Sequence, residues 1–156
     1  MKKATRERSA THAIFSIERN FQVAPARVFA AFATEEAKAA WFGGGDEWKL
    51  IRRAFDFRIG GHEHASGTWR SGMVSRFDCR YYDIVPDERI VYAYEMHLDA
   101  ARISVSLATV EFKPAGGGTR LVVTEQGVFL DGYEDKGSRE HGTGALLDRL
   151  GAALQR

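Results

Sequence analysis

The sequence predicts an α+β fold in which a curved antiparallel sheet of seven strands wraps around a long C-terminal helix. Two observations lead to this prediction. From Trp48 to Phe129 the chain is rich in aromatic and β-branched residues and is interrupted at short intervals by turn residues, which is typical of an antiparallel meander. Helical spacing of apolar residues occurs between the first strand and the meander and again at the end of the chain.

The first expected strand covers residues 12–21, in which apolar and polar residues alternate. Its inward face carries Ala13, Phe15, Ile17 and Phe21. Pro25 then suits the first turn of a helix, and Thr34 followed by Glu35 and Glu36 suits the N-cap and first turn of another. Two short helices are therefore expected after the first strand.

Six further strands follow and are joined by short turns such as DFRIGG and PAGGG. They are expected at residues 48–55, 62–69, 71–86, 89–98, 102–113 and 119–129. The last helix is expected from Ser138, which can cap it, to about Leu154. One stripe of this helix carries Thr143, Leu146, Leu147, Leu150 and Leu154.

Length and composition predict one domain. The chain has 156 residues, which suits a single core, and we expect a flexible N-terminal segment at 1–11 before a domain at 12–156. Lys and Arg number 22 against 21 Asp and Glu, so neither nucleic acid nor a membrane is expected as a partner. The exposed edges of a meander would allow a monomer or a homodimer.

Cysteine content and hydropathy predict a cytoplasmic protein. Cys79 is the one cysteine of the chain, so no intrachain disulfide can form and the fold needs no oxidising compartment. No apolar run has the length of a signal-peptide core or of a membrane span.

Simple dimensions predict a cavity between the sheet and the last helix. Seven strands spaced by about 4.8 Å form a sheet about 29 Å wide, whereas a helix is only about 10 Å thick. The helix therefore covers a strip of the apolar face. Gly142 and Gly144 would each cost this helix about 1 kcal/mol relative to alanine. Either they allow close packing on the sheet, or, together with Thr143, they widen one end of the cavity.

Alternation in two central strands places aromatic and sulfur-containing side chains on the face toward this cavity. One strand contributes Met73, Phe77, Cys79 and Tyr81, and the next contributes Ile90, Tyr92, Tyr94, Met96 and Leu98. Such a stripe also suits an ordinary core. The residues expected to line the cavity or its mouth are Trp41, Trp48, Trp69, Phe77, Tyr81, Tyr92, Tyr94, Met96, Glu125, Gly142, Thr143, Leu146 and Leu150.

Glu125 is the candidate for a catalytic residue. It shares a face with Leu121, Val123 and Phe129, so it is expected to point inward, where burial favours the protonated carboxyl. It could hold a ligand hydroxyl or act as a general acid or base. Two alternatives remain open: a Tyr, Arg or His partner that satisfies the carboxyl, or an irregularity at Gly127 that turns it outward.

No metal or cofactor site is predicted. His62 and His64 flank Glu63 and would point to the same face of a strand, as two metal ligands can, but the spacing fixes no third ligand. Cys79 on the apolar face of a strand suits an inert thiol better than a nucleophile. The glycines at 43–45 lack the following Lys and Ser or Thr of a phosphate-binding loop.

Several segments together resemble the START-like helix-grip superfamily, also called SRPBCC. They are DFRIGG, PDERIVY at 86–92, VEFKPAGGGTRLVVTEQG at 110–127 and EHGTGALLDRL at 140–150. Over about residues 12–154 the chain is similar to small bacterial proteins related to the C-terminal domain of the heat shock protein 90 ATPase activator. Such families often open the last helix with Glu-Gly-Trp, and this chain has Thr143 in the approximate place of that tryptophan.

The resemblance implies a helix-grip fold and, in most relatives, a pocket for a small apolar or aromatic molecule. Binding of such a molecule is the leading hypothesis, because the sequence provides a cavity but no convincing set of acid, base and nucleophile. The resemblance also implies two alternatives, namely a polyketide cyclase-like or aromatase-like enzyme that uses the same cavity, and a protein that contacts a chaperone.

Overall fold

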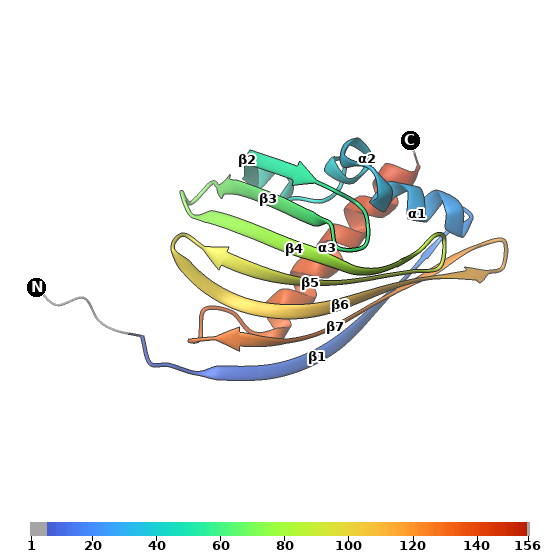
Figure 1. The fold of residues 1–156 in the computed structure, drawn as a ribbon. Coiled ribbons are helices and arrows are strands. Elements are labelled where there is room, and N and C mark those ends of the chain that lie inside the picture. Colours follow the sequence, from blue (N-terminus) through green and yellow to red (C-terminus); the bar gives the residue numbers. More distant parts are fainter. Residues whose placement is uncertain (1–5, 156) are drawn as a thin grey trace, which may run out of the picture.

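The computed structural model describes residues 6–155 and shows the predicted α+β architecture (Figure 1). In chain order the strands are β1 (Ala10–Phe21), β2 (Trp48–Phe55), β3 (His62–Trp69), β4 (Val74–Val85), β5 (Arg89–Leu98), β6 (Ala101–Ala115) and β7 (Gly118–Leu130). The helices are α1 (Pro25–Ala33), α2 (Glu35–Ala39) and α3 (Lys136–Leu154), with a short 3-10 helix at Gly45–Glu47. β1 begins two residues before the expected domain boundary at residue 12, and residues 1–5 of the segment expected to be flexible lie outside the described residues.

The strands form one antiparallel sheet in the order β1-β7-β6-β5-β4-β3-β2. Strands β2 to β7 are a meander, in which each strand pairs with the next along the chain. β1 is added at the far side by pairing with β7, from Ala10 opposite Leu130 to Phe21 opposite Thr119. The sheet curves around α3, which crosses its concave face (Figure 1). This is the helix-grip fold that the sequence predicts.

The two short helices after β1 form as the sequence predicts. Pro25 occupies the first turn of α1, and the Thr34 hydroxyl caps α2 by accepting a backbone hydrogen bond of 3.2 Å. Phe29 and Phe32 of α1 pack edge to face on Phe112 of β6, with ring centroids 5.4 and 5.3 Å apart. These contacts hold α1 over one end of the sheet (Figure 1).

Helix α3 begins two residues earlier than predicted, because Asp135 rather than Ser138 is its N-cap. The Asp135 carboxylate accepts a hydrogen bond of 2.8 Å from the backbone N–H of Ser138. Its 19 residues give a length of about 29 Å. Across residues 6–155, no helix is both long and apolar enough to cross a membrane.

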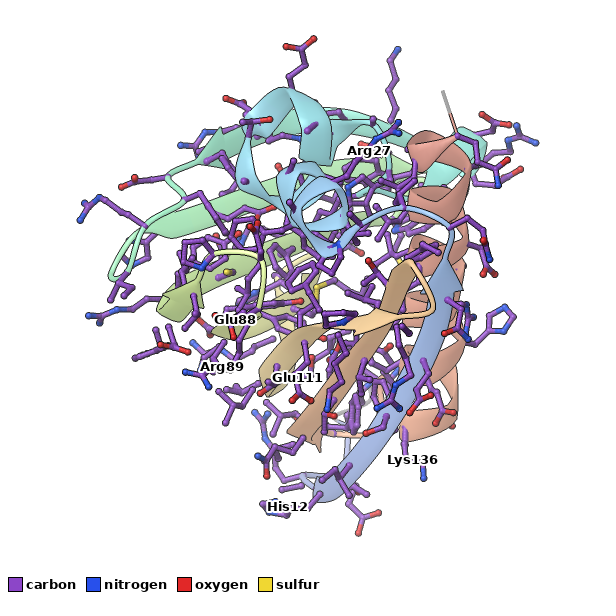
Figure 2. All side chains as sticks on the ribbon, turned by 90° about the vertical axis from the view of Figure 1, so that its right-hand side faces the viewer. His12, Arg27, Glu88, Arg89, Glu111 and Lys136 are labelled. Carbon is purple, nitrogen blue, oxygen red and sulfur yellow. The ribbon has the colours of Figure 1, made fainter. Side chains whose placement is uncertain are left out.

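The two ends of α3 lie at opposite ends of the molecule. In Figure 2, Lys136 marks the first turn of α3, and Arg27 of α1 lies at the other end, near the C-terminus. The Arg27 guanidinium donates to the carbonyl oxygen of Leu154 at 3.0 Å. Since the last carbonyls of a helix have no partner within the helix, this bond both satisfies one of them and ties α1 to α3.

Trp48 at the start of β2 explains three glycines. A Cβ atom at Gly43, Gly44 or Gly67 would overlap the side chain of Trp48. The indole therefore lies directly on the backbone of the loop after α2 and of β3, an approach that only glycine permits.

Met73 does not take the inward position expected of it. It lies in the turn before β4 and is 45% exposed.

Candidate ligand-binding cavity

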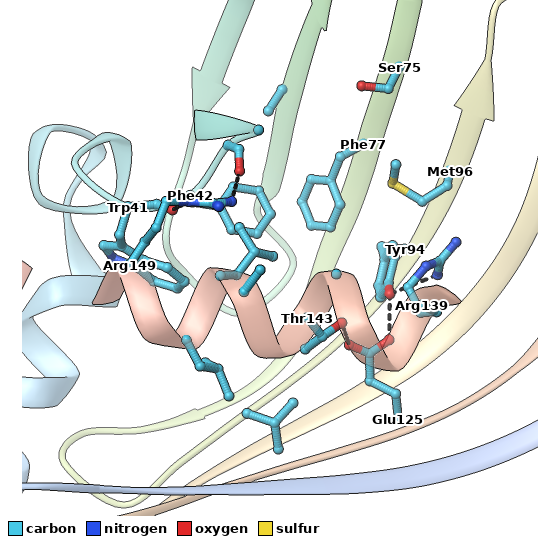
Figure 3. Close-up of a pocket in the computed structure, with 18 of the residues that line it drawn as sticks. Trp41, Phe42, Ser75, Phe77, Tyr94, Met96, Glu125, Arg139, Thr143 and Arg149 are labelled. Atoms are coloured by element: carbon cyan, nitrogen blue, oxygen red, sulfur yellow. Dashed lines mark hydrogen bonds between the residues drawn. The ribbon is translucent and has the colours of Figure 1, made fainter. Parts of the chain in front are cut away.

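A cavity of about 440 Å³ lies between α3 and the concave face of the sheet (Figure 3). From α1, α2 and the following loop it is lined by Phe32, Lys38, Trp41, Phe42, Gly43 and Gly44. From the sheet it is lined by Trp48, Ala65, Trp69, Ser75, Phe77, Tyr92, Tyr94, Met96, Val110, Val123 and Glu125. From α3 and its approach come Glu134, Ser138, Arg139, Gly142, Thr143, Ala145, Leu146, Leu147 and Arg149.

Strands β4 and β5 supply an aromatic wall. Their register sets Phe77 opposite Met96 and Tyr81 opposite Tyr92, so alternate side chains of both strands face inward. Ring centroids lie 5.0 Å apart for Phe77 and Tyr94, and 5.8 Å apart for Tyr92 and Tyr94. Such tilted contacts are typical of aromatic clusters, and all three rings line the cavity.

Two tryptophans from β2 and β3 are fixed by one serine of β4. The indole N–H groups of Trp48 and Trp69 both donate to Ser75 Oγ, at 3.1 and 3.0 Å. Because each indole has only this one polar atom, the shared acceptor satisfies both and leaves the apolar ring surfaces available to the cavity.

The loop after α2 borders the cavity and is held by two arginines. Arg149 of α3 donates to the carbonyl oxygen of Gly43 and, at 3.3 Å, to that of Trp41. Arg53 of β2 donates to the carbonyl oxygen of Phe42 at 2.8 Å. Figure 3 shows Trp41, Phe42 and Arg149 together at one end of the site. The loop is therefore tied to both the helix and the sheet.

Glu125 lies at the other end, with Tyr94, Thr143 and Arg139 (Figure 3). It points inward as predicted and is 4% exposed. The Tyr94 hydroxyl donates to its Oε1 atom, and the Thr143 hydroxyl lies 3.5 Å from its Oε2 atom. Of the two alternatives left open by the sequence, the structure thus shows the first: a tyrosine partner for an inward carboxyl.

Arg139 binds this cluster to the sheet. Its Nε and Nη2 atoms donate to both carboxylate oxygens of Glu134, at 3.0 and 2.6 Å. The remaining N–H groups meet the hydroxyl oxygens of Tyr94 at 2.9 Å, Ser104 at 2.7 Å and Ser106 at 3.5 Å. All five N–H groups of the guanidinium therefore have acceptors, and Glu134 offsets its charge.

Burial raises the pKa of the Glu125 carboxyl above its usual value, against the opposing effects of the Tyr94 hydrogen bond and the charge of Arg139. Burial likewise raises the pKa of the Tyr94 hydroxyl, which therefore stays protonated. A carboxyl whose protonated form is favoured can donate a hydrogen bond or a proton to a bound molecule, and its ionised form can accept one.

A second buried polar cluster joins α2 to β3 and β4. Lys38 Nζ lies 2.5 Å from Glu63 Oε1 and 3.3 Å from the Tyr81 hydroxyl, which itself donates to Glu63 Oε1 at 2.5 Å. Lys38 is 3% exposed, and Glu63 and Tyr81 are each 1% exposed. Lys38 lines the cavity, whereas the other two lie behind it.

Most of the residues expected at the cavity lie in its lining. They are Trp41, Trp48, Trp69, Phe77, Tyr92, Tyr94, Met96, Glu125, Gly142, Thr143 and Leu146. Tyr81 and Leu150 do not line it. Tyr81 is buried against Lys38 and Glu63, and Leu150 is fully buried in the core. Their inward orientation was predictable, but their depth depends on which neighbours cover them.

The two glycines of α3 differ in surroundings. Gly142 lies at the cavity, and a Cβ built on it would meet no atom within 4 Å. A Cβ on Gly144 would lie 3.1 Å from the guanidinium of Arg19 on β1. Both explanations offered by the sequence therefore apply, one to each residue: open space at Gly142 and close packing on the sheet at Gly144.

The histidines of β3 do not gather around a metal position. His64 Nδ1 lies 2.7 Å from Asp78, while Glu63 between the two histidines points inward to Lys38. The described part of the chain contains no group of three His, Cys, Asp or Glu side chains placed to hold a metal ion. Burial raises the pKa of the Cys79 thiol to about 12, which makes it a poor nucleophile.

Sequence reasoning missed Lys38, Phe42, Arg139 and Arg149 as lining residues. A signal for Arg139 was present, because β6 carries small inward residues at Ser104, Ser106 and Ala108. Small side chains on an inward face leave room for a large one from the opposite element. For Lys38 no such signal exists, since a lysine in a short helix is ordinarily solvent-exposed.

The fold and cavity define a helix-grip protein with a partly open, mostly apolar cavity between the helix and the sheet. The chain belongs to the family described as Activator of Hsp90 ATPase homolog 1-like protein, whose profile matches residues 22–155. Comparison with curated proteins gave no match.

Solved structures of bacterial proteins are similar to the chain. One from Rhizobium leguminosarum is 48% identical, with a TM-score of 0.91 over 96% of this chain and 99% of that one. One from Rhizobium loti is 43% identical, with a TM-score of 0.86 over 93% and 99%. An AHSA1-like protein from Aeromonas hydrophila, 17% identical with a TM-score of 0.71 over 92% of each chain, shares the fold.

Proposed function

We propose that the protein binds a small hydrophobic or aromatic molecule in the cavity between α3 and the sheet. The observation that carries this proposal is the cavity itself, about 440 Å³ and walled by the rings of Phe77, Tyr92 and three tryptophans. Binding sites for small molecules usually have volumes of about 300–1,000 Å³, apolar walls and a few polar groups. Glu125, Tyr94 and Lys38 are among the polar groups that line it.

The binding proposal can be tested with the purified protein. Native mass spectrometry would show a retained molecule, and thermal unfolding with naphthalene, indole and fluorene would show stabilisation, because a ligand that binds only the folded state raises its stability. In the variant Gly142→Trp, a bulky ring occupies the open space at the cavity and should abolish the stabilisation. Gly137→Trp, in the first turn of the same helix and outside the lining, is the matched control.

The binding proposal fails if no retained molecule appears and none of the three compounds stabilises the protein. It also fails if Gly142→Trp and Gly137→Trp respond alike to every compound. In that case the thermal shift would come from binding outside the cavity.

A second candidate is an enzyme of the cyclase or aromatase type, and it is supported by Glu125. The carboxyl is buried at one end of the cavity, its pKa is raised by burial, and the Tyr94 hydroxyl contacts it. If Glu125 transfers a proton to or from a substrate, Glu125→Gln should abolish turnover while leaving the affinity for the substrate unchanged. Loss of affinity without loss of turnover would contradict this role.

A third candidate follows from the family description, which names an activator of the Hsp90 ATPase. Contact with a chaperone would use the outer surface and not the cavity. Such contact should therefore be unaffected by Gly142→Trp. Co-purification of the chaperone with both the wild type and this variant would support it, and an ATPase rate unchanged by the protein would contradict activation.

A further inference from the structure

We propose that Lys38 forms a subsite for the carbonyl oxygen of a ligand in this cavity. The bound molecule is then a flat apolar compound with a carbonyl group, as in an aromatic ketone or a quinone. This inference rests on the proposed function, because it needs a molecule in the cavity. It adds the chemical group by which that molecule is selected.

Lys38 brings an ammonium group into an aromatic part of the cavity wall. Its Nζ atom lies 4.5 Å from the ring centroid of Phe42, 5.8 Å from that of Tyr92 and 6.0 Å from that of Phe77. All three rings line the cavity. A flat ring system that packs on them would therefore bring a polar substituent to the ammonium group.

The ammonium group has a hydrogen-bond donor to spare. A lysine ammonium has three N–H groups, and here Glu63 Oε1 and the Tyr81 hydroxyl accept two of them. Within residues 6–155 the third has no acceptor. Arg139 at the opposite end of the cavity is different, because all five of its N–H groups are used. Of these two cations, Lys38 is therefore the one with an N–H group left for a ligand oxygen.

Glu63 decides which kind of oxygen suits this donor. Its carboxylate lies behind Lys38 and offsets the positive charge at a distance of 2.5 Å. An anionic ligand would lose its hydration on entering the cavity and would meet a pair whose charges already cancel. A carbonyl oxygen loses much less hydration and needs only one N–H group. The pair therefore favours a neutral acceptor.

Stability alone does not account for a buried pair at this position. Taking two charges out of water costs about as much as their attraction returns, and apolar residues of similar size often replace such pairs without loss. Here the pair is also incompletely satisfied, because Glu63 Oε2 has no hydrogen-bond partner in the described part of the chain. A use for the free N–H group of Lys38 explains why the pair is kept beside a cavity.

Fluorene and 9-fluorenone provide the test, because they share one flat shape and differ by a CH₂ group against a carbonyl. Their affinities are measured by equilibrium dialysis with the wild type and with the double variant Lys38→Met/Glu63→Gln, which removes both charges together. The ratio of fluorenone to fluorene affinity should fall by about tenfold in the double variant, the usual contribution of a hydrogen bond to a charged donor. Dividing by the fluorene affinity corrects for the change in the cavity wall, which both compounds meet.

The matched control is a second Lys–Glu pair, Lys113 with Glu111, which lies on the surface at 3.6 Å. The double variant Lys113→Met/Glu111→Gln should keep the wild-type affinity ratio. If fluorene binds and the ratio is the same in all three proteins, the oxygen subsite is overturned and ligand binding stands. If neither compound binds the wild type, the oxygen subsite is overturned, and the binding proposal is decided separately by native mass spectrometry and the thermal shifts.

A second measurement needs no variant and remains decisive if the double variant does not fold. Infrared spectra of 9-fluorenone bound to the wild type report hydrogen bonding to the carbonyl directly. The carbonyl band should lie at lower wavenumber than in hexane and near its position in an alcohol. A band at the hexane position would overturn the proposal.

Discussion

Two buried polar clusters reach the cavity and satisfy their charges to different extents. At one end, Arg139 uses every N–H group and Glu134 offsets its charge through two hydrogen bonds. At the other, Lys38 and Glu63 offset each other, but one N–H group and one carboxylate oxygen are left over among the described residues. Both clusters are buried, so burial by itself does not distinguish their roles.

The difference in hydrogen bonding indicates two roles. A fully satisfied cluster fixes structure, and Arg139 holds the first turn of α3 against β5 and β6 through Tyr94, Ser104 and Ser106. An incompletely satisfied one has capacity for a further partner. Glu125 lies between these cases, because Tyr94 contacts one of its oxygens while burial still favours its protonated form.

The largest expected effect on stability comes from removing one partner of the buried pair of Lys38 and Glu63. Lys38→Met leaves the Glu63 carboxylate buried without its counter-ion, which should lower the free energy of unfolding by about 3–5 kcal/mol in urea denaturation. The double variant Lys38→Met/Glu63→Gln should recover most of that loss. Equal losses for the single and double variants would contradict the assignment of a coupled pair.

A smaller loss of stability is expected when Arg139, whose N–H groups all have acceptors, is replaced. Arg139→Lys keeps the charge but removes the planar fork that meets Glu134 and the hydroxyl groups, so it should cost about 2 kcal/mol. The control is Arg120→Lys in the exposed pair with Glu18, where a change below about 1 kcal/mol is expected. If both substitutions have the same effect on urea unfolding, the network around Arg139 does not fix α3.

Glu125 should make the free energy of unfolding depend on pH, with a slope of at most about 1.4 kcal/mol per pH unit for a single proton. Because its pKa is raised in the folded state, that state binds the proton more tightly. The stabilisation is full below the unfolded pKa and is lost as pH rises through the folded pKa. Wild type should therefore lose stability relative to Glu125→Gln as pH rises above about 4.5. A constant difference between the two unfolding curves would mean that the pKa is not raised.

The two glycines beside Thr143 should show the smallest effects. Gly142→Ala places its methyl group in open space, so it should raise helix stability by up to about 1 kcal/mol. Gly144→Ala should raise stability less, because its methyl group would press on the Arg19 guanidinium. This guanidinium is held by an ion pair of 3.0 Å between Arg19 Nε and Asp148 Oδ1. Urea unfolding of both variants gives the comparison, and a larger gain at position 144 would reverse the packing assigned to α3.

Strand positions were predictable because local chemistry sets them. β2, β3 and β5 have the expected boundaries, since alternating apolar residues stop at the turn residues that flank them. The start of α3 was placed wrongly because Asp135 and Ser138 are both good caps, and only their backbone conformation decides between them.

The inward carboxyl of Glu125 was also predictable, because residues two apart along β7 share a face. Its partners were not. Tyr94 lies on β5, two strands away, and Arg139 comes from α3. The sequence offers no distance rule that brings these three side chains together.

By itself the sequence determined the order of strands and helices, the inward faces of β1, β4, β5 and β7, and the family resemblance. These features depend on neighbouring residues and on fixed periods of two and 3.6 residues. The tertiary structure alone decided that Lys38 is buried against Glu63, that Arg139 reaches two serines, and that Gly142 and Gly144 have different surroundings. Such contacts depend on how closely separate elements approach, and no local period encodes that distance.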